Sequence, residues 1–188
     1  MTMKRFTRRT FLGLAGAAAA AGLAPRTARA GIGPNEKINL AVIGCGGMGS
    51  RHIEALAVND NCNLAALCDV YIPRYVDQQK VVEERSGRKP DGYQDFRRVL
   101  ERNDIDAILV ATPDHWHPLL TILGCEAGKD VYVEKPACTT VQEGRAMVNA
   151  ARRYGSVVQV GIQQRSMPLF QQAIEIIHSG RLGVITSV

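Results

Sequence analysis

The fold is decided by one stretch, Lys37-Ile38-Asn39-Leu40-Ala41-Val42-Ile43-Gly44-Cys45-Gly46-Gly47-Met48-Gly49, in which an apolar run leads into spaced glycines. Ser50–Ala57 follows and has a helical pattern. A strand, a glycine turn and a helix in this order are typical of a dinucleotide site, where Gly44 allows the tight turn, Gly46 admits a pyrophosphate and Gly49 lets the helix pack closely. The helix N-terminus offers free N–H groups to phosphates. The predicted cofactor-binding residues of this turn are Gly44, Gly46, Gly47, Met48 and Gly49.

A second apolar run ends in an acid. Asn63–Cys68 leads into Asp69, which lies about 20 residues beyond the glycine turn, where a dinucleotide site places its ribose-binding carboxylate. The alternative is a glycine-rich turn followed by a surface aspartate. The combination of both elements favours the nucleotide site.

Strands and helices alternate along the rest of the chain. The further predicted strands cover Tyr93, 106–112, 130–134, 157–161 and the beginning of one at 184–188. The further predicted helices cover 75–86, 96–102, 118–127, 140–154 and 168–179. This alternation predicts an α/β fold with a doubly wound parallel sheet and helices on both faces. Right-handed crossovers place the carboxyl end of every strand at one edge, where ligands bind.

Three polar segments follow predicted strands and should meet the glycine turn at that edge: Thr112-Pro113-Asp114-His115, Glu134-Lys135-Pro136 and Gly161–Arg165. Lys135 comes directly after a buried strand, so we expect its side chain to point into the cleft. There it could hydrogen-bond a substrate hydroxyl and stabilise the oxyanion during hydride transfer. The alternative is a surface lysine paired with Glu134.

His115-Trp116-His117 suggests a metal site at first sight. No third ligand has a matching spacing, so we predict no metal site. We expect His115 and Trp116 to line the cofactor cleft and His117 to pack at the start of a helix. Trp116 could stack on a cofactor ring or a sugar, or it could simply cover the edge of the sheet.

The positive charge of the chain is concentrated at its beginning. The formal net charge is +5, but six of the 23 basic residues precede Gly31 and no acidic residue does, which leaves 17 basic against 18 acidic residues. The remainder is close to neutral and gives no support for nucleic-acid binding. Five scattered cysteines without a C-x-x-C pattern argue against a disulfide framework. We expect Cys45 to be a packing residue.

The first 30 residues have the pattern of a leader. Thr7-Arg8-Arg9-Thr10-Phe11-Leu12 is a twin-arginine pattern, 14–24 is rich in alanine and glycine, and Ala28-Arg29-Ala30 is an A-x-A cleavage site. The apolar part is too short and too weakly apolar for a stable membrane span. We predict a signal peptide at 1–30 and export of the folded protein to the periplasm or another extracytoplasmic space. The alternative is a disordered or membrane-anchoring N-terminus.

Residues 37–188 resemble the Gfo/Idh/MocA oxidoreductases on the glycine turn, Cys68-Asp69, 111–117, Val133-Glu134-Lys135-Pro136 and 161–165. The resemblance implies NAD(P)-dependent oxidation or reduction of sugars, inositols and related polyols. Lys135 would be the catalytic or substrate-binding lysine. Asp69 would hold the adenosine ribose and favour NAD, although Arg74 nearby leaves NADP open. Further cofactor contacts would come from Thr112, Pro113, His115, Trp116 and Glu134, and further substrate contacts from Gln163 and Arg165.

The leader is similar to that of the exported branch of this family, which includes the glucose–fructose oxidoreductases and retains its bound cofactor. The resemblance divides the chain into a leader at 1–30, a Rossmann domain at 31–161 and the truncated beginning of a substrate domain at 162–188. In the family that second domain supplies the substrate surface, a histidine acid/base and often the dimer face. We therefore assign no acid/base here, and expect a homo-oligomer only with that domain.

Two other functions stay open. The first is a glycosidase of the same superfamily that uses NAD transiently, similar to N-acetylgalactosaminidases. Such enzymes tend not to carry the E-K-P element, so Glu134-Lys135-Pro136 favours the dehydrogenase. The second is a non-catalytic nucleotide-binding remnant, if the chain truly ends at Val188.

Overall fold

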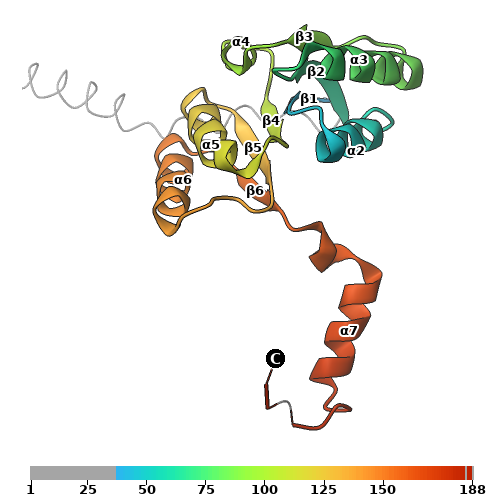
Figure 1. The fold of residues 1–188 in the computed structure, drawn as a ribbon, viewed down its shortest axis with the longest axis vertical. Helices are drawn as coiled ribbons and strands as arrows, with labels where there is room; N and C mark the ends of the chain where they lie inside the picture. Colours follow the sequence, from blue (N-terminus) through green and yellow to red (C-terminus); the bar gives the residue numbers. More distant parts are fainter. Residues whose placement is uncertain (1–36, 185, 188) are drawn as a thin grey trace, which may run out of the picture. The chain divides into compact units, whose positions relative to one another are not determined.

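A computed structural model describes residues 37–184, 186 and 187 (Figure 1). The predicted leader and its cleavage site lie outside the described residues. The strands are β1 (Ile38–Ile43), β2 (Cys62–Cys68), β3 (Asp91–Tyr93), β4 (Ala107–Val110), β5 (Asp130–Glu134) and β6 (Val158–Gly161). The α-helices are α2 (Gly47–Leu56), α3 (Ile72–Ser86), α4 (Phe96–Leu100), α5 (His117–Glu126), α6 (Val141–Tyr154) and α7 (Pro168–His178), and the 3₁₀ turns are η1 (Asp114–Trp116) and η2 (Gln163–Ser166).

The six strands form one parallel sheet in the order β3-β2-β1-β4-β5-β6. This confirms the doubly wound α/β fold predicted from the alternation of elements. The chain moves outward from β1 in one direction through β2 and β3, then crosses over to β4 and continues in the other direction. The order therefore reverses between β1 and β4, and a crevice forms outside the carboxyl ends of strands at such a point.

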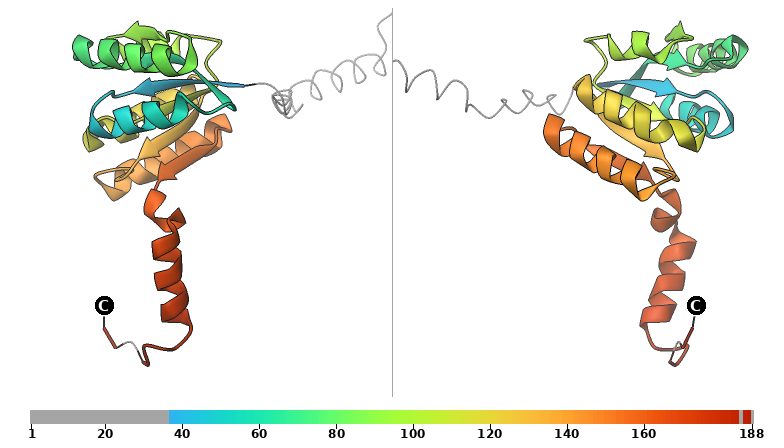
Figure 2. Two further views of the ribbon diagram at one scale, coloured as in Figure 1. Left: turned by 90° about the vertical axis from the view of Figure 1, so that its right-hand side faces the viewer. Right: turned by 60° about the vertical axis from the view of Figure 1, so that its left-hand side comes forward.

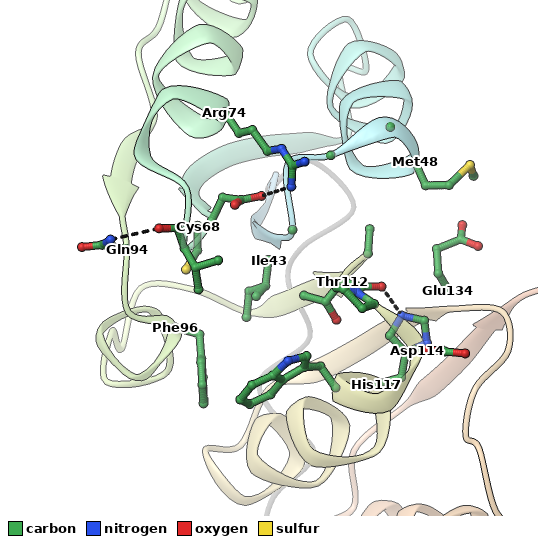
Figure 3. Close-up of a pocket in the computed structure, with 18 of the residues that line it drawn as sticks. Ile43, Met48, Cys68, Arg74, Gln94, Phe96, Thr112, Asp114, His117 and Glu134 are labelled. Atoms are coloured by element: carbon green, nitrogen blue, oxygen red, sulfur yellow. Dashed lines mark hydrogen bonds and ion pairs between the residues drawn. The ribbon is translucent and has the colours of Figure 1, made fainter.

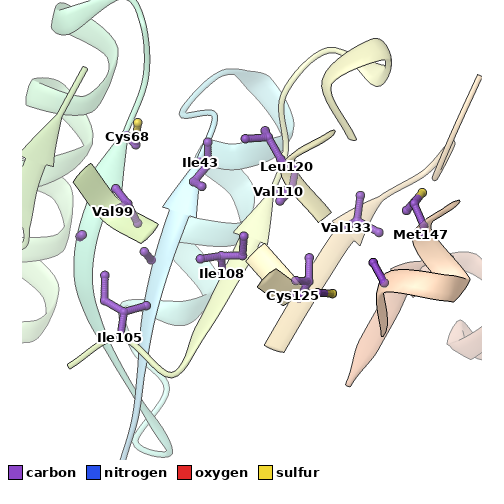
Figure 4. Close-up of a cluster of buried hydrophobic side chains, with 14 residues drawn as sticks. Ile43, Cys68, Val99, Ile105, Ile108, Val110, Leu120, Cys125, Val133 and Met147 are labelled. Carbon is purple, nitrogen blue, oxygen red and sulfur yellow. The ribbon is translucent and has the colours of Figure 1, made fainter. Parts of the chain in front are cut away.

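Each face of the sheet has its own apolar core. Successive side chains of a strand point to opposite faces, so Ala41 and Ile43 join the cluster that includes residues of α4, α5 and α6, shown in Figure 4. Val42, between them, joins the cluster with residues of α2 and α3. Since both faces are apolar, the central strands lack polar alternation, as is typical of parallel sheets. Figure 2 shows helices on both sides of the sheet.

Capping residues mark the starts and ends of several helices close to the positions that the sequence predicts. Thr140 and Glu143 form the capping box at the start of α6, and Gly155 ends that helix in the left-handed conformation with φ 67°. Asp95 accepts a hydrogen bond from the backbone N–H of Arg97 and caps α4. These contacts satisfy backbone groups that a helix end leaves without partners.

The sequence offers no partner for the strand predicted to begin at Val184, so this segment is expected to stay unpaired. Among the described residues at the end of the chain, Val184, Thr186 and Ser187 belong to no strand. A strand needs a neighbour to complete its hydrogen bonds, and β6 pairs only with β5 in the described sheet. The preceding helix α7 buries none of its residues. No helix in the described part of the chain is long and apolar enough to cross a membrane.

Candidate functional site

The register of the sheet aligns the carboxyl ends of four strands. Ile43 of β1 pairs with Cys68 of β2 and with Val110 of β4, which in turn pairs with Val133 of β5. The loops that follow these strands therefore begin side by side. This brings the glycine turn, Asp69, the Thr112 segment and the Glu134 segment together, as the sequence predicts.

A cleft of about 870 Å³ lies at this edge, and Figure 3 shows the side chains that surround it. Ten of the predicted site residues line it: Gly44, Gly46, Gly47, Met48, Asp69, Thr112, Pro113, Trp116, Glu134 and Lys135. His115, Gln163 and Arg165 are not among the lining residues. Gly49 lies beneath the turn and is buried.

The glycines of the turn have different tasks. Gly44 has φ +96°, and a Cβ there would lie 2.6 Å from the carbonyl oxygen of Ala111. A Cβ on Gly49 would lie 1.8 Å from the carbonyl oxygen of Gly44, so a side chain there would force α2 away from β1. A Cβ on Gly46 would meet only the guanidinium of Arg74, at 3.7 Å. Gly44 and Gly49 therefore shape the turn, whereas Gly46 keeps space open in the cleft.

Asp69 holds the turn from the end of β2. One carboxylate oxygen accepts a hydrogen bond of 2.9 Å from the backbone N–H of Cys45, and the other accepts one of 2.9 Å from that of Tyr71. The guanidinium of Arg74 lies 4.0 Å from the same carboxylate. Because each carboxylate oxygen can accept more than one hydrogen bond, Asp69 keeps capacity for ligand hydroxyls.

We expect Asp69→Ala to weaken the binding of NAD(H) by about 1–3 kcal/mol, the scale of hydrogen bonds to a charged group. The variant loses the acceptor for ribose hydroxyls and the support of the Cys45 N–H. Calorimetric titration with NADH measures the change. Asp77→Ala, at an exposed carboxylate on α3 that pairs with Lys80, is the control and should bind normally. Equal affinities of the two variants would argue against a ribose role for Asp69.

Several polar groups of the cleft are left for a ligand. The Thr112 hydroxyl is buried and has no hydrogen-bond partner among the described residues. The N-terminus of α2 has no side-chain cap and no acidic residue in its first turn. A helix N-terminus without these groups attracts an anion. The donors, the open space at Gly46 and the fixed carboxylate of Asp69 fit a dinucleotide.

Glu134 is a buried carboxylate that joins three segments. It is 3% exposed. One of its oxygens accepts hydrogen bonds from Nε2 of His52, at 2.6 Å, and from the side-chain amide of Gln163. The other accepts one of 3.1 Å from the backbone N–H of Lys135. The Lys135 side chain forms no ion pair with Glu134 in the described structure, which argues against the surface-pair alternative.

The three residues of the His115-Trp116-His117 motif go to different places. His117 is buried at the first position of α5, as expected, but also lines the cleft. Trp116 lies in the cleft with its ring 6.3 Å from that of Phe96, edge to face. The exposed His115 lies outside the lining, because the 3₁₀ turn η1 directs successive residues differently. No group of metal-binding side chains was found among the described residues.

Other parts of the site were not predicted. The stretch 94–97, which spans the loop after β3 and the start of α4, contributes Gln94, Asp95, Phe96 and Arg97 to the lining. No polar motif marks it, and its only signal is its position after a strand. His52, on the helix after the glycine turn, also had no motif to indicate its bond with Glu134.

Two buried thiols lie close to the site: Cys68 lines the cleft, and Cys45 belongs to the glycine turn. Burial, together with the nearby Asp69 carboxylate, raises the pKa of Cys45 and of Cys68 to about 12 in each case. Both are therefore protonated at neutral pH, and a thiol is a poor nucleophile. This agrees with the expectation that Cys45 is a packing residue.

The fold and the cleft define a nucleotide-binding domain of the Rossmann class. Residues 38–162 match the Gfo/Idh/MocA family model, described as an oxidoreductase family with an NAD-binding Rossmann fold. The chain belongs to this family. The resemblance predicted from the motifs is confirmed at this level, and with it the cofactor class, NAD or NADP.

The chain is also similar to several known proteins. The chain is 31% identical over 123 residues to an alpha-N-acetylgalactosaminidase of Bacteroides fragilis, covering 64% of this chain and 29% of that protein. It is 28% identical to the WlbA dehydrogenase of Bordetella pertussis in complex with NADH and UDP-GlcNAcA, with a TM-score of 0.66 over 79% of this chain and 44% of that one. The chain is 26% identical to myo-inositol 2-dehydrogenase of Lactobacillus plantarum, with a TM-score of 0.68. That match covers 80% of this chain and 43% of the dehydrogenase. The chain spans less than half of each protein.

Proposed function

We propose that the chain is the nucleotide-binding part of an NAD(P)-dependent oxidoreductase that acts on a CH–OH group of a sugar, an inositol or a related polyol. The main observation in support of this proposal is that Lys135 lines the same cleft as the glycine turn and Asp69. The WlbA and inositol dehydrogenases support the substrate class. When bound, the cofactor supplies a nicotinamide that accepts or donates a hydride.

Different residues of the chain bind the cofactor and the substrate. The N-terminus of α2 and Asp69 hold the phosphates and the adenosine ribose. Lys135 donates a hydrogen bond to the substrate hydroxyl and stabilises negative charge on its oxygen. Gln163 and Arg165 lie in the 3₁₀ turn after β6, outside the cleft lining, and are the proposed substrate contacts beyond it. The amide of Gln163 is already directed toward this side by its bond to Glu134.

The test is turnover in a protein that extends over the length of its relatives. We expect NADH to form with a member of a panel of sugars and inositols, and Lys135→Ala to lower kcat by about 100-fold or more, the scale of losing one electrostatic contact in the transition state. NADH binding to the variant should stay close to that of the wild type. Lys89→Ala, an exposed lysine before β3, is the control. Unchanged turnover in Lys135→Ala would overturn the assignment.

A glycosidase that uses NAD in a transient oxidation is the second candidate. The likeness to the alpha-N-acetylgalactosaminidase supports it, whereas Glu134-Lys135-Pro136 favours the dehydrogenase by resemblance to the family. The same substrate panel separates the two. Release of a leaving group from an N-acetylgalactosaminide without accumulation of NADH would identify the glycosidase.

We further propose that the protein is exported in folded form by the twin-arginine route. The support is Arg8-Arg9 followed by Ala28-Arg29-Ala30. Exported material should begin at Gly31 when its N-terminus is sequenced. Replacing Arg8 and Arg9 with lysine should keep the protein in the cytoplasm, whereas Arg26→Lys should not. Exported protein that begins at Met1, or export that survives the double change, would contradict the proposal.

A further inference from the structure

One buried side chain joins the two loops between which the cleft opens. Nδ1 of His117 lies 2.7 Å from the carbonyl oxygen of Pro136, and Nε2 lies 2.8 Å from that of Thr112. Pro136 follows Lys135, and Thr112 follows the loop residue Ala111 after β4. His117 therefore connects the segment that carries the lysine with the segment beside the glycine turn. His117 is 2% exposed.

The two contacts set a condition on the ring. A carbonyl oxygen can only accept a hydrogen bond, whereas a neutral imidazole has one donor nitrogen and one acceptor nitrogen. A neutral ring would turn a lone pair toward one of the oxygens, and a buried acceptor without a donor is costly. Both contacts are satisfied only when each nitrogen carries a hydrogen.

We propose that His117 is a positioning residue that holds the Lys135–Pro136 segment against the Thr112 segment as an imidazolium. Two charge-assisted hydrogen bonds then connect the loops after β5 and β4. The inference goes beyond the proposed reaction, because such a clamp would shape the nucleotide cleft whatever substrate is used.

The decisive experiment observes the ring nitrogens themselves. The chain has four histidines, so a long-range proton–nitrogen NMR correlation of the ¹⁵N-labelled full chain is simple enough to assign. The His117 signals are those lost in His117→Gln, and His178→Gln provides a matched assignment control. At neutral pH we expect both His117 nitrogens in the range of N–H nitrogens. A bare nitrogen on that ring would overturn the imidazolium.

Variants test the clamp separately. His117→Gln keeps an amide with two N–H donors, whereas His117→Leu removes all donors. We expect His117→Leu to weaken NADH binding by about tenfold, the equivalent of one hydrogen bond to a charged group. His117→Gln should recover most of the affinity, and His178→Leu on α7 should match the wild type. Equal affinities of the Leu and Gln variants would overturn the role of the donors.

The readouts separate this inference from the proposed function. If the wild-type chain bound no NADH, its nucleotide role would fail while the NMR spectrum still tested His117. If His117→Leu did not fold, as judged by circular dichroism, the wild-type spectrum and the His117→Gln affinity would decide. A His117→Gln protein that folds but binds NADH about tenfold more weakly than the wild type, the loss expected without any donor, would count against the clamp.

Discussion

Gly46→Val should abolish NAD(H) binding while leaving the domain folded. A Cβ at this position meets only Arg74, at an ordinary contact distance of 3.7 Å, so the turn can hold the new side chain. Its two methyl groups would then fill the space in front of the N-terminus of α2, where a pyrophosphate approaches the backbone. We expect a loss of about 3 kcal/mol or more, which is at least about 100-fold in affinity.

Calorimetric titration with NADH measures this loss, and thermal unfolding checks the fold. Ala55→Val, at an exposed position of the same helix, is the matched control because it adds a valine outside the cleft. It should bind NADH as the wild type does. A Gly46→Val protein that retains wild-type affinity would show that the phosphates do not approach this turn.

Glu134→Ala should destabilise the fold strongly. It leaves the side chains of His52 and Gln163 and the backbone N–H of Lys135 without their acceptor. Stranded donors in a buried place cost about 1–3 kcal/mol each, and the loss of one partner of a buried pair about 3–5. Because His52 is partly exposed and can regain water, we expect the free energy of unfolding to fall by about 2–4 kcal/mol.

Urea denaturation of the wild type and of Glu134→Ala measures the difference in their free energies of unfolding. Glu54→Ala is the control, since Glu54 forms an exposed ion pair of 3.6 Å with Arg85, and such pairs contribute about 0–1 kcal/mol. The Glu134 variant should also lose the coupling to His52, so that adding His52→Ala costs little more. Similar midpoints for Glu134→Ala and Glu54→Ala would mean that the buried contacts do not stabilise the sheet edge.

The fold was predictable because its signals are local and repeated. The run that ends at Ile43 is apolar on both faces, Gly44 must adopt a positive φ, and Thr140 with Glu143 marks a helix start. Topology rules then bring Asp69 and Glu134 to one edge without any knowledge of side-chain contacts. Val184, Thr186 and Ser187 show the limit of such signals, because these described residues are outside any strand although the composition around them is β-rich.

The details of the site were less predictable because they depend on pairs far apart in the chain. His52 and Glu134 are separated by 82 positions, and nothing in either local sequence indicates that they touch. The exposed His115 and the buried His117 have the same chemistry and are only two residues apart. Only the direction of the turn η1 and the start of α5 decide which of them enters the cleft.

The high pKa values of Cys45 and Cys68 make the thiols a reporter of motion. Alkylating reagents attack the thiolate and need access, so neither sulfur should react while the cleft floor is closed. Labelling then requires the glycine turn to lift from the sheet, an opening with its own free energy. The rate at which these two sulfurs are alkylated therefore reports how often the glycine turn opens. A bound dinucleotide that holds the turn closed will lower this rate.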